Sequence, residues 1–172
     1  DNQLCMIDFM VIAAPRSATT WASNWLTTDT TLCIHDPLYT WHYNQLDGLT
    51  SKKSLGVSCT GLYWFSEWVN KHPARKVILH RDVSEIDESL MALGLPALDA
   101  DAEKRLDSIK GVHLDWRDVF DAPKRMYEYL LERPFDEERH AVLREIEMQP
   151  QFEGLTINKE AVSKLYNELR SL

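Results

Sequence analysis

Two short stretches of this sequence carry side chains that could bind an anion. One is the loop Pro15–Trp21, PRSATTW, in which the basic residue Arg16 comes before small and hydroxyl-bearing residues. The other is the pair Arg81 and Ser89. An arginine donates a fork of hydrogen bonds to phosphate or sulfate oxygens, and hydroxyl and backbone N–H groups add further donors. These residue types predict a phosphate or sulfate site, whose chemistry does not require a metal ion.

The loop must be positioned by a strand that precedes it and a helix that follows it. Phe9–Ala14 is a continuous apolar run, which is typical of a parallel strand covered on both faces. Pro15 cannot continue the hydrogen-bond ladder, and apolar residues of 21–26 recur at helical spacing. Such a corner directs backbone N–H groups and the positive end of the helix dipole at one spot. An ordinary strand–turn–helix corner has the same pattern.

The remaining chain alternates between strand and helix patterns. Apolar runs predict strands at 32–35, 54–58, 76–81 and 111–116. Apolar residues at helical spacing predict helices at 62–71, 82–93, 102–110, 139–148 and 159–169, and one that begins at Ala122-Pro123. In the first of these helices, the tryptophans Trp64 and Trp68 are expected in the core. We therefore expect a single α/β domain over residues 1–172, with a mostly parallel sheet of about five strands flanked by helices.

The motif PRSATTW resembles the phosphosulfate-binding loop of sulfotransferases, whose common forms are PKSGTTW and PRSGTT. A Walker A loop instead has a Gly-Lys pair before its hydroxyl residue, and this chain has no such pair. The family belongs to a branch of the P-loop folds and uses 3′-phosphoadenosine 5′-phosphosulfate (PAPS) as its donor. Ala18 stands where the family usually has glycine, and alanine is costly there if the position needs a positive φ.

The resemblance implies a role for each residue of the loop and of the Arg81/Ser89 pair. Arg16 would neutralise charge on the bridging oxygen of PAPS, and Arg81 with Ser89 would hold its 3′-phosphate. Trp21 would stack on the adenine or, as an alternative, pack the helix onto the sheet. Arg81 could also be a structural ion-pair residue. The implied cofactor-binding residues are Arg16, Ser17, Ala18, Thr19, Thr20, Trp21, Arg81 and Ser89, with Asp82 or Glu85 as the alternative ion-pair partners of Arg81.

Asp36 is the residue we expect to act as the base. It follows the predicted strand at 32–35, and the carboxyl ends of parallel strands share one edge of a sheet. Many sulfotransferases with this loop carry a glutamate at that place, often before proline, as in His35-Asp36-Pro37 here. His35 and His42 are alternative bases, and Asp36 could instead serve only to form a turn. The aromatic segment 38–50 would line an acceptor pocket or act as a lid packed on the core.

Composition limits the class of protein. Asp and Glu number 27 against 19 Lys and Arg, and the net charge of −8 argues against nucleic-acid binding. The three cysteines lack metal-site spacing, and we expect them to be reduced core residues of a cytoplasmic protein. No apolar run is long enough to span a membrane.

The resulting expectation is a sulfotransferase that transfers a sulfuryl group from PAPS to a hydroxyl or amine. The acceptor is a small molecule, a carbohydrate or a peptide tyrosine, and the sequence does not indicate an oligomeric state. The chain lacks the RKG-type segment that completes the 3′-phosphate site in cytosolic members. Two alternatives remain open: a P-loop kinase of small molecules, and a non-catalytic nucleotide-binding relative.

Overall fold

Five parallel strands form the central sheet of the computed structural model, which describes residues 6–146, 152–153 and 156–157. The strand order is β2-β3-β1-β4-β5. The strands are β1 (Phe9–Ala13), β2 (Thr31–His35), β3 (Ser54–Cys59), β4 (Arg75–His80) and β5 (Val112–Asp115). A separate antiparallel pair joins β6 (Phe152–Glu153) to β7 (Thr156–Ile157). The expected parallel sheet flanked by helices is confirmed.

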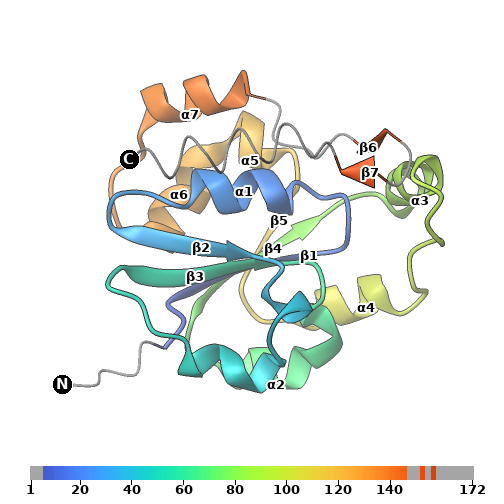
Figure 1. The fold of residues 1–172 in the computed structure, drawn as a ribbon, viewed down its shortest axis with the longest axis horizontal. Coiled ribbons are helices and arrows are strands. Elements are labelled where there is room, and N and C mark those ends of the chain that lie inside the picture. The colour runs from blue at the N-terminus through green and yellow to red at the C-terminus, as the bar shows by residue number, and fades with distance from the viewer. Residues whose placement is uncertain (1–5, 147–151, 154–155, 158–172) are drawn as a thin grey trace.

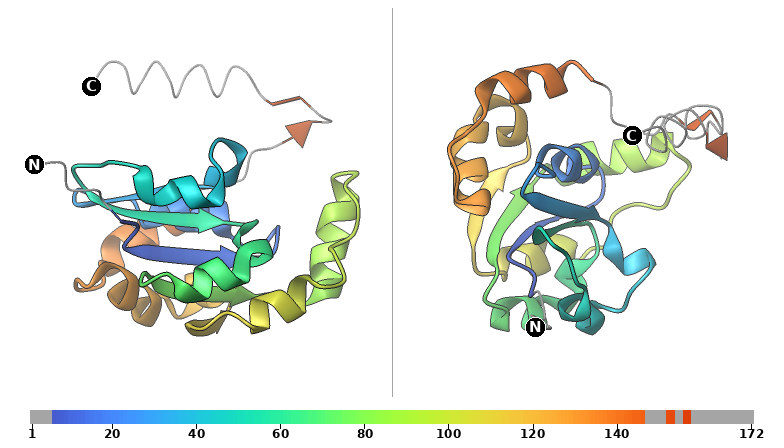
Figure 2. Two further views of the ribbon diagram at one scale, coloured as in Figure 1. Left: turned by 90° about the horizontal axis from the view of Figure 1, so that it is seen from below. Right: turned by 60° about the vertical axis from the view of Figure 1, so that its left-hand side comes forward.

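Helices cover both faces of this sheet (Figure 1). One layer contains α1, α5, α6 and α7, and the other contains α2 and α4; Figure 2 gives the same arrangement from two other sides. The α-helices are α1 (Thr19–Trp25), α2 (Ser66–Lys71), α3 (Val83–Ala92), α4 (Ala102–Asp107), α5 (Asp118–Asp121), α6 (Pro123–Leu131) and α7 (Glu137–Arg144), and three 3-10 helices are η1 (Pro37–Tyr39), η2 (Tyr43–Gly48) and η3 (Leu62–Phe65).

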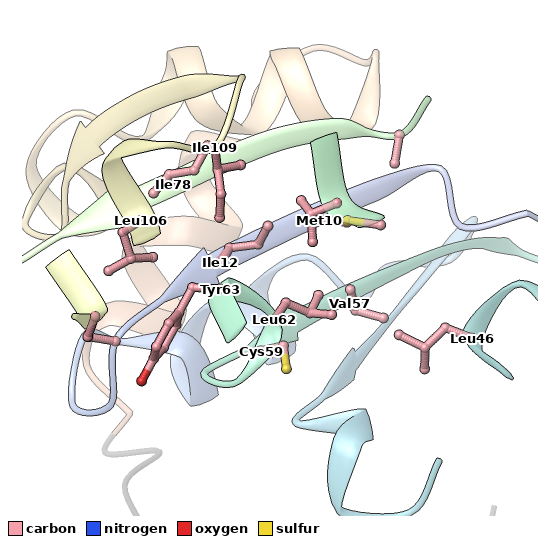
Figure 3. Packing of buried hydrophobic residues seen from close by; sticks show 14 of the residues in the cluster. Met10, Ile12, Leu46, Val57, Cys59, Leu62, Tyr63, Ile78, Leu106 and Ile109 are labelled. Carbon is pink, nitrogen blue, oxygen red and sulfur yellow. The ribbon is translucent and has the colours of Figure 1, made fainter. Parts of the chain in front are cut away.

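The central strand β1 shows why the sheet needs a layer on each side. Its side chains alternate between two apolar clusters, Phe9 and Val11 in the cluster under α1 and α6, Met10 and Ile12 in the cluster under α2 and α4. All five residues of β1 are buried. Figure 3 shows the second cluster, where Met10 and Ile12 lie among side chains of β3, β4 and the helices beyond them. A strand buried on both faces has no polar face, which explains its unbroken apolar sequence.

The order of the strands places a switch point between β1 and β4. From β1 the chain passes through α1 to β2, at one edge of the sheet. From β4 it passes through α3 and α4 to β5, at the opposite edge. The two connections therefore leave neighbouring carboxyl ends in opposite directions. In open α/β sheets, ligands bind in the crevice at such a point. The loop that leaves β1 and the helix α3 lie at this same end of the sheet (Figure 1).

Two contacts at helix ends fix the helices that flank this point. The side chain of Asp82 accepts a hydrogen bond from the Ser84 N–H and caps the start of α3. At the other end of α1, the guanidinium of Arg139 donates to the carbonyls of Trp25, Asn24 and Thr27. It thereby satisfies carbonyl groups that a helix end leaves without a partner.

Some expectations about individual elements were wrong. Residues 62–71 form the 3-10 helix η3 followed by α2, not one α-helix, and Trp64 is 44% exposed instead of lying in the core. The helix expected at 139–148 begins earlier, at Glu137, and the one expected at 159–169 lies outside the described residues.

Two of the cysteines lie in the core as expected. Cys33 and Cys59 are buried free thiols, and burial raises the pKa of the Cys59 thiol to about 11; Cys5 lies outside the described residues. Of the helices described, none combines the length and the apolar character that a membrane crossing needs.

Close packing of β3 against β1 predicts a large effect of one methyl group at Gly56. A Cβ added there would lie 2.1 Å from Cε2 of Phe9, whose ring is fully buried, so the ring would have to shift within the core. We expect Gly56→Ala to lower the free energy of unfolding by about 1–3 kcal/mol, as overpacked core residues do. Urea denaturation measures this loss. Gly48→Ala is the control, because nothing lies within 4 Å of its added Cβ, and a loss of the same size at both glycines would contradict the packing argument.

Candidate functional site

The loop between β1 and α1 has an unusual backbone. Arg16 and Ala18 both adopt left-handed conformations, with φ values of 65° and 66°. Ser17 between them is buried. The Ser58 hydroxyl donates a 2.8 Å hydrogen bond to the Thr19 carbonyl and so ties the start of α1 to β3. Because Ala18 has a φ of 66°, position 18 does adopt the positive φ that glycine reaches without strain.

Arg16, Arg81 and Ser89 meet at the switch point. The Nε of Arg16 donates to the Ser89 hydroxyl at 2.9 Å, across 73 residues of sequence. The guanidinium of Arg81 donates to the backbone carbonyl of Arg16. The loop after β1 is thus joined to both members of the pair that the sequence singled out after β4. Two guanidinium groups and one hydroxyl lie together at the edge where parallel sheets bind ligands.

Arg81 also takes part in a charged cluster at the end of β5. Its Nε lies 3.2 Å from Glu85, and its guanidinium lies over the ring of Trp116, 4.2 Å from the centroid. Arg117 contacts the same two groups, at 2.9 Å from Glu85 and 5.3 Å from the Trp116 centroid. Arg81 therefore does form an ion pair, as the alternative interpretation expected, and its partner is Glu85. Asp82 caps α3 instead.

A second group of side chains surrounds His35 at the carboxyl end of β2. The Nε2 atom of His35 lies 3.2 Å from the Thr20 hydroxyl, 3.5 Å from the Thr19 hydroxyl and 3.2 Å from the Asp36 carboxylate. The other Asp36 oxygen accepts hydrogen bonds from the Thr60 N–H and hydroxyl at 2.9 and 3.2 Å. His35 therefore connects the loop to Asp36. The sequence had offered His35 only as an alternative base and had not predicted these contacts.

A small depression lies next to Asp36. Its volume is about 150 Å³, and the chain after β2 and the chain after β3 form its walls. It is large enough for only a small group of a ligand. Its lining residues are Asp36, Leu38, Tyr39, Cys59, Thr60 and Gly61.

Trp21 packs α1 against the helical layer. It is 5% exposed, and its ring contacts Trp25, Phe120 and His140 at centroid distances of 4.8 to 5.4 Å. Its Nε1 donates to the Leu143 carbonyl at 3.2 Å. These contacts support the packing role, because a base could stack on this ring only if its aromatic neighbours moved.

The aromatic segment 38–50 divides between two places. Tyr39 is 90% exposed at the rim of the depression beside Asp36, whereas Trp41 packs against the core. His42 contacts Tyr43 and Phe65, and the described contacts do not bring it to the loop. Of the two alternative bases, the structure places His35 at the loop.

Four supporting residues of the site were not predicted: Ser58, Thr60, Trp116 and Arg117. Each lies within two residues of the carboxyl end of β3 or β5. The signal that could have found them is their place at a strand end, because these ends share one edge with the loop. Among the residues described, no group of three or more His, Cys, Asp or Glu side chains is placed to hold a metal ion.

A pair of histidines lies directly beside Arg81. The Nε2 of His113 donates a 2.7 Å hydrogen bond to the Ile109 carbonyl. The Nδ1 of His113 therefore accepts a 2.6 Å hydrogen bond from the Nε2 of His80. Burial, and then the neighbouring His113, lower the pKa of His80 below its ordinary value. Asp107, 3.8 Å from Nδ1 of His80, acts in the opposite direction. The lowered pKa favours the neutral form of His80.

Comparisons of the chain with protein-family models, with curated proteins and with solved structures find no match. The function must therefore be inferred from the chain's own residues.

The left-handed backbone at Ala18 predicts the effect of restoring glycine there. A left-handed conformation costs a non-glycine residue about 1–2 kcal/mol, which is about as large as the chain entropy and the one buried methyl group that the change to glycine loses. We expect Ala18→Gly to change the free energy of unfolding by less than about 1 kcal/mol, because the relief of strain offsets these losses. Thermal or urea denaturation measures this change.

Ala22→Gly is the matched control for this experiment. Ala22 is fully buried and lies inside α1, where the same substitution should cost about 1–2 kcal/mol in helix propensity and buried surface. Equal losses at the two positions would show that Ala18 is not strained.

The lowered pKa of His80 predicts a loss of stability in mild acid. Below the unfolded value of 6.5, the unfolded chain binds a proton at this histidine before the folded protein does. The free energy of unfolding should therefore fall as the pH drops from 7.5 through 6.5 toward the lower folded pKa. We expect this fall to be smaller in His80→Gln, measured by urea denaturation at each pH. His42→Gln, at an exposed histidine, is the control, and an unchanged pH dependence in His80→Gln would refute the assignment.

Proposed function

We propose that this protein is a sulfotransferase that transfers a sulfuryl group from PAPS to a hydroxyl or amine acceptor. The observation that carries the proposal is the meeting of Arg16, Arg81 and Ser89 at the switch point of the sheet. The resemblance had connected these residues to one cofactor from sequence alone. Their contact across the fold supports that connection, since separate structural roles would not require it.

The residues at this point fit a nucleotide that carries anionic groups at two positions, the 3′-phosphate and the 5′-phosphosulfate. Arg16 and Arg81 supply two permanent positive charges and Ser89 a hydroxyl donor. Arg16 and Ala18 both have left-handed backbones, and turns that contain such residues are a common way for successive backbone N–H groups to bind an anion. Arg117 adds a third cation at the same edge, next to Glu85. In the proposed complex, the 3′-phosphate competes with Glu85 for Arg81.

The loop residues stabilise charge in the proposed reaction. PAPS would supply the activated sulfuryl group. The S–O bond to the phosphate breaks, a new bond forms from sulfur to the acceptor oxygen or nitrogen, and the phosphate oxygen gains negative charge. Arg16 and the loop N–H groups neutralise that charge, which is the usual contribution of fixed donors in transfers of this type. The hydroxyls of Thr19 and Thr20 lie at the same loop.

Asp36 is the base in this proposal, and His35 is the other candidate for the role. Thr60 holds one oxygen of the Asp36 carboxylate, and His35 contacts the other. The acceptor proton passes to this pair as the new S–O bond forms. The small depression beside Asp36 is where the acceptor would enter. Its chemistry suits a hydroxyl of a small molecule, a carbohydrate or a peptide tyrosine.

A non-catalytic nucleotide-binding relative is the second candidate. The observation that favours it is the hydrogen bond from Arg16 to Ser89, because it directs the Arg16 side chain toward α3 rather than toward the loop hydroxyls. A P-loop kinase is less well supported, since the loop has no Gly-Lys pair. Binding of 3′-phosphoadenosine 5′-phosphate without consumption of PAPS, in the presence of phenolic, sugar and peptide acceptors, would favour the non-catalytic relative.

Calorimetric titration with 3′-phosphoadenosine 5′-phosphate tests the proposal, with AMP and ATP as comparison ligands. We expect binding that depends on the 3′-phosphate. Arg81→Ala should weaken it about tenfold to a hundredfold, because a hydrogen bond to a charged group contributes about 1.5–3 kcal/mol. Ser89→Ala should weaken it less, because a neutral hydroxyl gives a weaker bond than a guanidinium.

Arg125→Ala serves as the control variant, since Arg125 is exposed on α6 and should bind as the wild type does. Denaturation curves of each variant verify that it is folded. Equal affinity for AMP or ATP, no binding at all, or an Arg81→Ala variant that binds like the wild type would each overturn the PAPS assignment.

A further inference from the structure

A larger pocket lies on the other side of the molecule from α1. Its volume is about 560 Å³, within the range of sites for small ligands. Helices η2, η3, α2 and α4 form it, and none of its lining residues belongs to the loop or to the groups around Arg81 and Asp36. The lining residues are Tyr43, Trp64, Phe65, Ser66, Glu67, Trp68, Lys71 and Arg105.

Aromatic rings make up much of the wall of this pocket. Tyr43 and Phe65 are stacked with centroids 4.2 Å apart, and Trp68 meets Tyr43 edge-on at 5.5 Å. Trp64 is 44% exposed. An exposed tryptophan beside a row of packed rings presents a flat apolar surface, on which another flat ring can stack.

One cation in the pocket, Arg105, has no anionic partner among residues 6–146. The Arg105 guanidinium lies over the Trp64 ring, 4.8 Å from its centroid. Its Nε is shielded from solvent and has no hydrogen-bond acceptor, and in residues 6–146 no carboxylate lies within ion-pair distance of this side chain. Arg125 also lacks a protein partner there, but it is exposed, so water solvates it. Lys71 is paired with Glu67 at 2.9 Å.

An unpaired, half-buried arginine is unexpected in this chain. With 27 acidic and 19 basic residues, acidic partners are plentiful, and buried polar groups without a partner are rare in native proteins. The missing partner can come from outside the chain. A guanidinium binds carboxylate and phosphate-type groups through its fork of donors, and its place over an indole ring adds a cation–π surface beside that fork.

We propose that this pocket is a second binding site, for an aromatic ring that carries a carboxylate, phosphate or sulfate group. The ring stacks on Trp64 and along the wall made by Phe65, and the anionic group pairs with Arg105. The site is independent of the proposed PAPS site, since the two share no residue.

Titration with three naphthalene compounds tests this site: 2-naphthoate, 2-naphthyl phosphate and the neutral 2-naphthol. We expect at least one of the two anions to bind at least tenfold more tightly than 2-naphthol, measured by calorimetry and by quenching of tryptophan fluorescence. The anion that binds with the higher affinity shows whether the pocket prefers a carboxylate or a phosphate ester. Arg105→Gln should weaken anion binding at least tenfold and bring it close to that of 2-naphthol.

Three further variants test whether the naphthalene anions bind in this pocket rather than elsewhere on the protein. Arg125→Gln removes an exposed arginine outside the pocket and should bind like the wild type. Trp64→Ala removes a partly exposed ring and should also weaken binding, which verifies the stacking surface. Arg81→Ala should leave binding of the naphthalene anions unchanged, so a failure of the PAPS assignment does not affect this result. No binding of either anion, equal binding of 2-naphthol, or an Arg105→Gln variant that binds like the wild type would overturn the proposal.

Discussion

The candidate site depends on a strained loop that its neighbours hold in place. Left-handed residues at 16 and 18 raise the energy of the backbone, and such a conformation persists only where surrounding contacts determine it. Those contacts come from three strands: Ser58 of β3 holds the Thr19 carbonyl, Arg81 after β4 holds the Arg16 carbonyl, and the loop itself follows β1. The parallel sheet brings these strand ends to one edge.

Charge is distributed differently at the two candidate sites. At the sheet edge, Arg81 and Arg117 share the carboxylate of Glu85, and both lie near the Trp116 ring. An anionic ligand there has to compete with an existing ion pair. In the aromatic pocket, Arg105 meets a ring but no carboxylate in the described part of the chain. An arginine that already has a partner can serve structure and binding alike, whereas the Nε of Arg105 has no hydrogen-bond partner among the described residues.

Local geometry explains where the sequence was misleading. The expectation that Trp64 lies in the core assumed one α-helix over 62–71, at about 3.6 residues per turn. The first four residues form a 3-10 helix, at about 3.0 residues per turn, which changes the direction of each side chain and leaves Trp64 exposed. For Trp21, the sequence permitted both adenine stacking and packing. Its burial against Phe120 and His140 depends on α5 and α7, which lie more than 90 residues further along the chain.

The sequence by itself predicted the parallel sheet and the loop after β1, because apolar runs and turn residues are local properties, and its resemblance to sulfotransferases singled out Arg81 and Ser89. The tertiary structure decided which groups touch: that Arg16 bonds to Ser89, that His35 stands between Thr20 and Asp36, and that Trp116 lies beneath Arg81. It also left Arg105 without a carboxylate partner among the residues described. These contacts join segments far apart in sequence, so they depend on strand order and helix placement, which no local pattern encodes.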